Sequence, residues 1–111
     1  HGTGTTLGDP IEIRALTNVF KKDTDKKEFI PIGSVKSNIG HLESAAGFAG
    51  IAKVVLQMKH KKLVPSIHSE VLNPNINFSE TPFYVQRELS EWKKNEFPRR
   101  AGVSSFGAGG S

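Results

Sequence analysis

The chain has 111 residues, of which 36% are hydrophobic and 23% are charged, with a formal net charge of +4. This length favours one small domain, and the composition excludes a disordered chain and a membrane protein, since no apolar run approaches the ~20 residues that span a bilayer. The absence of cysteine excludes a disulfide framework and a thiol nucleophile within these residues, and without a signal segment we expect a cytoplasmic protein.

Residues 1–8 form a loop by composition, because they contain three glycines and three threonines. Such a backbone lets a ligand come close. The loop lacks the Gly-Lys-Ser/Thr ending of a P-loop, and no strand precedes it as the G-x-G-x-x-G dinucleotide fingerprint requires. We therefore expect a loop that a ligand can approach closely, but not a nucleotide-binding site.

A helix is predicted over residues 10–20, directly after this loop. Asp9 is the expected N-cap, Pro10 suits the first helical position, and Glu12 completes a capping box. Apolar residues at 13, 16 and 20 define the inner face, and Glu12 is expected to point outward. The N-terminus of the helix would then point back at the loop and at His1.

Residues 29–35 are typical of a strand, in which Pro31 favours the beginning or a sheet edge. A turn through Gly40 then delivers Lys36 and His41 to the start of the next helix. The positive end of that helix disfavours an imidazolium, so we expect His41 to be a neutral hydrogen-bond donor. We interpret the turn as half of an active site, although spacing alone equally allows Lys36 as a solvated strand end and His41 as a helix cap.

The segment from residue 44 to about 61 is apolar nearly all round, which is typical of a buried helix. Its first half consists almost entirely of alanine and glycine, so other backbones can approach closely and tertiary packing must hold the helix. Strand, turn and helix together make half of a βαβ unit.

The remaining residues predict an irregular crossover over 63–82, a strand over 83–88 and a last strand over 101–106 that runs into a glycine loop at 107–111. His60 and His68 have no cysteine or carboxylate companions at ligand spacing, so no metal site is predicted. The clustered basic residues are interpreted as solvated surface. A nucleic-acid partner is not expected, because no recognised binding motif accompanies the charge.

Five motifs, HGTGT (1–5), GDPIE (8–12), GSVKSNIGH (33–41), AAG (45–47) and VSSFG (103–107), follow one another along almost the whole chain. In this order they resemble the C-terminal half of a β-ketoacyl synthase (ketosynthase) domain. The DPIE and KSNIGH variants look more like those of modular polyketide synthases and animal-type fatty acid synthases than like free-standing bacterial fatty-acid enzymes.

This resemblance implies an α/β thiolase-type fold, in which two related halves form α-β-α-β-α layers. The chain would be an incomplete half with about three strands and two helices, and residues 1–111 would be one C-terminal segment without an internal boundary. The family performs a decarboxylative Claisen condensation in polyketide or fatty acid biosynthesis. A cysteine takes up an acyl chain, and a malonyl-type extender on an acyl carrier protein then loses CO2 and attacks the thioester.

By position, His1 and His41 match the two catalytic histidines of the family, and Lys36 matches its active-site lysine. Neutral imidazoles fixed as donors stabilise the enolate oxygen, typically by a factor of about 10²–10³ in rate each. Lys36 is expected to tune the electrostatics and to hold His1 or His41 in its hydrogen-bond network. The resemblance also implies residues that bind the substrate and its phosphopantetheine arm, namely Thr3, Thr5, Asn38, Phe106 and Gly107.

The nucleophilic cysteine of the family has no counterpart here, so the resemblance places it in an N-terminal half that precedes His1. A chain that opens without methionine fits a piece of a longer protein. We expect the isolated chain to be inactive and to expose apolar surface meant for its other half. The expected partners are that half, an acyl carrier protein bearing phosphopantetheine, and a second copy of the parent in a homodimer. No directly bound cofactor and no metal are expected.

Three alternatives stay open at this point. A non-elongating ketosynthase would only pass acyl chains on, although His1 argues against it. A non-catalytic αβ module would hold the carrier's phosphopantetheine without chemistry. A degradative thiolase-like enzyme fits less well, because KSNIGH is not the pattern of that branch. The acyl substrate, the extender and the position in an assembly line are not specified by these residues.

Overall fold

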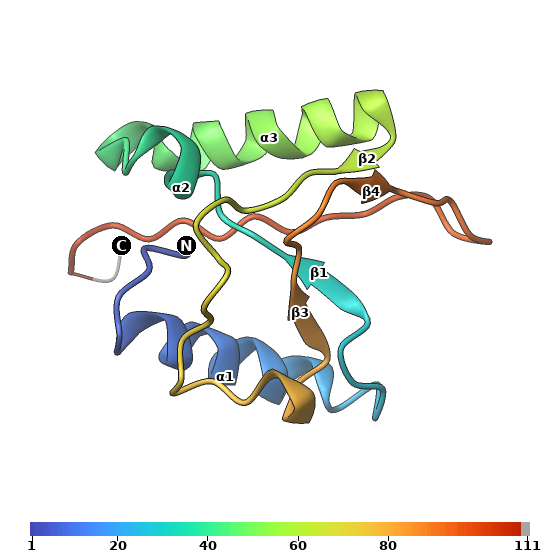
Figure 1. The fold of residues 1–111 in the computed structure, drawn as a ribbon, viewed down its shortest axis with the longest axis horizontal. Coiled ribbons are helices and arrows are strands. Elements are labelled where there is room, and N and C mark those ends of the chain that lie inside the picture. The colour runs from blue at the N-terminus through green and yellow to red at the C-terminus, as the bar shows by residue number, and fades with distance from the viewer. Residues whose placement is uncertain (110–111) are drawn as a thin grey trace.

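The computed structural model describes residues 1–109. The elements are α1 (Gly8–Phe20), β1 (Ile30–Ile32), α2 (Lys36–Ile39), α3 (Ala46–His60), β2 (Lys62–Leu63), β3 (Phe83–Val85) and β4 (Ser90–Glu91), with 3₁₀ helices at Glu43–Ala45 and Phe78–Glu80. The helices α1 and α3 lie on opposite sides of the β1–β3 pair (Figure 1). The predicted α/β class is confirmed, with two long helices and, among the described residues, four short strands.

Strands β1 and β3 pair in parallel, with Ile30 opposite Phe83 and Ile32 opposite Val85. The chain crosses from one to the other through α3, which is the βαβ connection that the sequence predicts. Both strands are shorter than predicted. Two residues beyond Ile32, the N–H of Ser34 donates to the side chain of Ser66 instead of to a strand. Strands β2 and β4 form a separate antiparallel pair.

Helix α1 ends at Phe20 as predicted, but the predicted capping box at its start is wrong. The helix begins at Gly8, and its N-cap residue Leu7 makes no side-chain capping bond. The carboxylates of Asp9 and Glu12 instead accept hydrogen bonds from the glycine loop. Glu12 therefore faces the loop and does not point outward. At the other end of the helix Phe20 packs on Phe83, with the ring centroids 5.4 Å apart.

Helix α3 has the predicted position, but the prediction that it is buried all round is wrong for this chain. Ala46 is its buried residue, whereas Phe48 is 78% exposed and Ile51, Val55 and Leu56 are each more than half exposed. The buried hydrophobic residues, Ile13, Ala46 and Phe83, make a very small core. An apolar helix face is therefore left uncovered by the residues that the structure describes.

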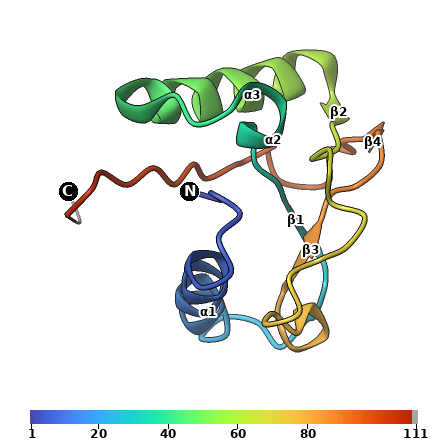
Figure 2. The same cartoon turned by 60° about the vertical axis from the view of Figure 1, so that its left-hand side comes forward.

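The predicted strand over 101–106 is wrong, because the structure assigns no strand there. The segment runs between α3 and the N-terminal loop (Figures 1 and 2). A Cβ at Gly50 would lie 2.9 Å from Val103 Cγ1, and one at Gly47 would lie 3.2 Å from Ser105 Cβ. The expected close approach of another backbone to the small residues of α3 is therefore confirmed. The segment that approaches α3 is extended and forms no strand pairing. The predicted glycine loop at 107–111 lies partly outside the described residues.

A membrane-spanning helix is not found among residues 1–109, because none of their helices is both long enough and apolar enough to cross a bilayer.

Candidate active site

The loop that carries His1 is held by the first turn of α1. The N–H of Gly2 donates to Glu12 Oε2 at 2.9 Å, and the amino nitrogen of His1 lies 2.7 Å from Glu12 Oε1. The N–H of Gly4 donates to Asp9 Oδ1 at 3.2 Å. Glu12 and Asp9 therefore support the loop of the site, whereas the sequence had suggested that they cap the helix. The available signal was two acids in a first turn that directly follows a loop rich in backbone donors.

Lys36 reaches the same loop from the start of α2. Its Nζ donates to the carbonyl oxygen of His1 at 2.7 Å, and Ser34 Oγ donates to the carbonyl oxygen of Gly2 at 2.9 Å. Lys36 and His1 are 35 positions apart in the chain, so the tertiary fold creates this contact. The ammonium is a strong, charged donor that fixes the peptide group next to the imidazole.

The two imidazoles lie together, with ring centroids 5.1 Å apart and ring planes at 75°. His41 Nδ1 accepts the N–H of Glu43 at 2.9 Å, and His1 Nδ1 accepts the N–H of Phe106 at 3.2 Å. A backbone N–H can donate only to an unprotonated ring nitrogen. In each ring Nδ1 is therefore occupied as an acceptor, and Nε2 is the nitrogen that can donate a hydrogen bond.

The glycine turn and the residues after it aim His41. Gly40 has φ +76°, as predicted for a turn that needs glycine. Glu43 also has a positive φ, +52°, a conformation that non-glycine residues rarely adopt. It is the N–H of Glu43 that meets His41 Nδ1, so the strained residue is also the one that fixes the ring.

A cavity of about 540 Å³ opens beside the two rings. It is lined by His1, His41, Glu43, Ser44, Phe106, Gly107 and Ala108. Four of the predicted site residues therefore meet there, although they come from both ends of the chain and from the turn after α2. The Phe106 ring lies 5.4 Å from the His1 ring and is 53% exposed at the cavity.

Three predicted binding residues do not reach this cavity. Thr3, Thr5 and Asn38 are all exposed and are absent from its lining. Thr5 Oγ1 accepts the N–H of Gly8 at 3.0 Å, so this hydroxyl supports the start of α1. Lys36 also lies behind the cavity wall, where it contacts the backbone of His1 rather than the open space.

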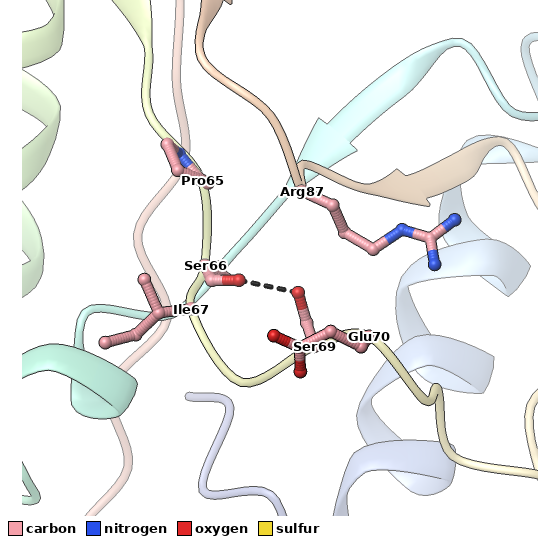
Figure 3. A pocket seen from close by; sticks show the side chains of 6 residues that line it. All are labelled: Pro65, Ser66, Ile67, Ser69, Glu70 and Arg87. Carbon is pink, nitrogen blue, oxygen red and sulfur yellow. Dashed lines mark hydrogen bonds between the residues drawn. The ribbon is translucent and has the colours of Figure 1, made fainter.

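A second hollow, of about 180 Å³, lies in the crossover after β2 and shares no lining residue with the cavity of His1 and His41 (Figure 3). It is lined by Pro65, Ser66, Ile67, Ser69, Glu70 and Arg87. None of the predicted site residues contributes to it. Among residues 1–109, moreover, no three His, Cys, Asp or Glu side chains gather closely enough to hold a metal ion.

Gly33 packs closely against Ser66, and Gly33→Ala is expected to destabilise the fold. A Cβ there would lie 2.5 Å from Ser66 Oγ and 3.5 Å from the Nζ of Lys53, whose burial lowers the pKa of its ammonium. Overpacking of this kind typically costs about 1–3 kcal/mol. Thermal denaturation should show a lower melting temperature.

Gly102→Ala is the matched control for this variant, because a Cβ at Gly102 meets nothing within 4 Å. It should leave the melting temperature unchanged. Equal melting temperatures for Gly33→Ala and the unmodified protein would contradict the close packing of Gly33 on Ser66.

Comparison with known proteins shows the family of this chain. The family described as "Beta-ketoacyl synthase, C-terminal domain" matches residues 1–70. The chain is 63% identical over 119 residues to polyketide synthase PksL of Bacillus subtilis (strain 168), covering 99% of this chain and 3% of that protein. It is 60% identical over 113 residues to polyketide synthase ThaG of Burkholderia thailandensis, covering 100% of this chain and 2% of ThaG.

Solved structures show the same likeness in three dimensions. The ketosynthase from module 6 of the bacillaene synthase of Bacillus subtilis 168 matches with a TM-score of 0.95 and 55% identity, covering 99% of this chain and 20% of that one. Ketosynthase twelve of the bacillaene polyketide synthase of Bacillus amyloliquefaciens matches with a TM-score of 0.92 and 52% identity, covering 96% and 19%. The chain thus spans about one fifth of a solved ketosynthase, and it belongs to the beta-ketoacyl synthase family, as a polyketide-synthase ketosynthase sequence matching the C-terminal domain.

Proposed function

We propose that residues 1–111 are the C-terminal segment of a ketosynthase domain that condenses an acyl thioester with a malonyl-type extender during polyketide biosynthesis. The observation that carries this proposal is the pairing of His1 and His41. Their rings lie 5.1 Å apart at one cavity, and hydrogen bonds to both Nδ1 atoms leave both Nε2–H donors free.

The reaction needs donors of this kind. Loss of CO2 from a malonyl thioester leaves its electron pair on the α-carbon, and the negative charge develops on the thioester oxygen as an enolate. The α-carbon then attacks the acyl thioester, a new carbon–carbon bond forms, and the thiolate of the nucleophile leaves. Two neutral donors fixed before the charge appears stabilise the enolate oxygen without any reorganisation. In this proposal His1 and His41 are the catalytic residues, and Lys36 holds His1 and adds positive charge behind it.

The nucleophile must come from outside these residues, because the chain contains no cysteine. We infer that it lies in the remainder of the domain, which would also cover the exposed face of α3. An uncovered patch made of Phe48, Ile51, Val55 and Leu56 is unusual for a monomeric protein and fits a surface that packs against another segment. The isolated chain is then expected to be inactive.

The proposed partners follow from the same chemistry. Acyl and malonyl groups would arrive on the phosphopantetheine arm of an acyl carrier protein, so the protein needs no resident cofactor of its own. Phe106 and Gly107 line the cavity and are positioned to contact the acyl chain. Thr3, Thr5 and Asn38 remain proposed contacts for the arm, because all three are exposed. The parent is proposed to act as a cytoplasmic homodimer.

Intact-protein mass spectrometry tests this function on the complete ketosynthase domain. The domain is mixed first with an acylated carrier protein and then with a malonylated one. We expect an acyl-enzyme, followed by CO2 release and a β-ketoacyl carrier protein. An acyl-enzyme that never yields the extended product would favour a ketosynthase that only transfers acyl chains. Saturable binding of the carrier without any acyl-enzyme would favour a non-catalytic module.

A further inference from the structure

Ser34 lies where three segments of the site meet. Its hydroxyl donates to the carbonyl oxygen of Gly2 at 2.9 Å and accepts the backbone N–H of Lys36 at 3.3 Å. Its own N–H donates to Ser66 Oγ at 2.9 Å. One serine therefore joins the loop of His1, the start of α2 and the crossover that follows β2.

Ser66 anchors this connection to the sheet. It is only 8% exposed, and its N–H donates at 2.9 Å to the carbonyl oxygen of Gln86, directly after β3. Its carbonyl oxygen accepts the hydroxyl of Ser69 (Figure 3). Buried polar groups that are satisfied on several sides are held in one position. A continuous series of hydrogen bonds thus runs from the end of β3 through Ser66 and Ser34 to Gly2.

Gly2 packs closely against Ser34. Gly2 has φ +62°, and a Cβ on it would lie 3.0 Å from Ser34 Cβ. The contact therefore requires both the left-handed backbone and the missing side chain. Because Gly2 directly follows His1, a shift of Ser34 would be passed to the backbone that carries the imidazole.

We propose that Ser34 is a positioning residue, which keeps His1 and Lys36 in register so that the Nε2–H donors of His1 and His41 face the same cavity. Ser34 is absent from the cavity lining, so it acts through its neighbours and touches no substrate. The inference rests on the proposed condensation function and adds a residue to it. The hydroxyl matters because it is the donor that holds the Gly2 carbonyl oxygen.

The test is Ser34→Ala in the complete ketosynthase domain, with acyl-enzyme formation and β-ketoacyl product measured separately. Condensation is expected to fall about tenfold, which is the size of effect that losing one uncharged hydrogen bond in a precise site produces. Acylation is expected to keep its rate, because the proposed nucleophile lies outside these residues. A merely structural role would instead lower both rates together with the melting temperature.

Ser79→Ala is the matched control, since it removes an exposed hydroxyl that bonds only locally, to Asn77. It should leave both rates unchanged. If Ser34→Ala does not fold, Ser66→Ala breaks the same connection one step further from the site and should also slow condensation selectively. A folded Ser34→Ala or Ser66→Ala domain that condenses at the wild-type rate would overturn the inference about Ser34 and leave the proposed function standing. Failure of the wild-type domain to condense would overturn the proposed function and this inference with it.

Discussion

His1→Ala and His41→Ala, each in the complete ketosynthase domain, are expected to slow condensation by about 10²–10³-fold while the acyl-enzyme still forms. Each variant removes one preorganised Nε2–H donor from the cavity where the enolate charge is proposed to develop. In the proposed function the nucleophile is supplied elsewhere in the domain, so loading of the acyl chain is expected to need neither donor. Product formation after a preloaded acyl-enzyme is mixed with malonyl carrier protein measures the effect directly.

The double variant makes this prediction sharper. If both donors act on the same oxygen, the loss in the double variant should be well below the product of the two single losses, because residues that act as a unit are not additive. His68→Ala is the control, since His68 is an exposed histidine in the crossover. Condensation at the wild-type rate in either single variant would contradict the proposed role of that residue.

The local signals in the sequence predicted the parts of the fold that depend on local physics. The apolar spacing placed α1 and α3, and the glycine between Lys36 and His41 marked a turn that indeed needs a positive φ at Gly40. The motif order then suggested that residues at both ends of the chain meet. In the structure His1, His41 and Phe106 do share one cavity.

Other predictions failed where one side chain could choose between several hydrogen-bond partners. The spacing of residues in the sequence does not show which partner is bound. Asp9 and Glu12 have the spacing of a capping box, but the same spacing also presents both carboxylates to the loop N–H groups, and the loop binds them. The contacts of Ser34 were not predicted, because a lone serine after a strand carries no signal of what it will contact. Sequence alone also could not show that Thr5 Oγ1 would accept the N–H of Gly8.

The burial of α3 and the strand over 101–106 failed for a different reason. Apolar pattern reports the environment of a segment in its complete fold, whereas this chain spans 20% of a solved ketosynthase chain. A helix face or a strand whose neighbours lie outside the described residues keeps its composition but shows no burial and no ladder. The sequence therefore predicted the chemical character of both segments and not the contacts seen in the structure.

Lys36→Met is expected to slow condensation on the order of 10²-fold, again with the acyl-enzyme still formed. Methionine is nearly as long as lysine and equally flexible, so it can fill the space while removing both the charge and the donor to the His1 carbonyl oxygen, which Nζ contacts at 2.7 Å. Lys59→Met, at the exposed end of α3, is the control for a lysine outside the site and should leave the rate unchanged.

Two further variants separate the geometry of Lys36 from its charge. Lys36→Gln keeps an N–H donor without a charge, so recovery of most of the rate would assign Lys36 to the placement of His1 alone. Lys36→Arg keeps the charge, but its planar guanidinium does not reproduce a single ammonium contact, and we expect only partial recovery. The ammonium lies behind His1 and outside the cavity lining. We therefore expect the full condensation rate to need both its hydrogen bond to His1 and its positive charge. Full activity of Lys36→Met would show that the contact with His1 is structural only.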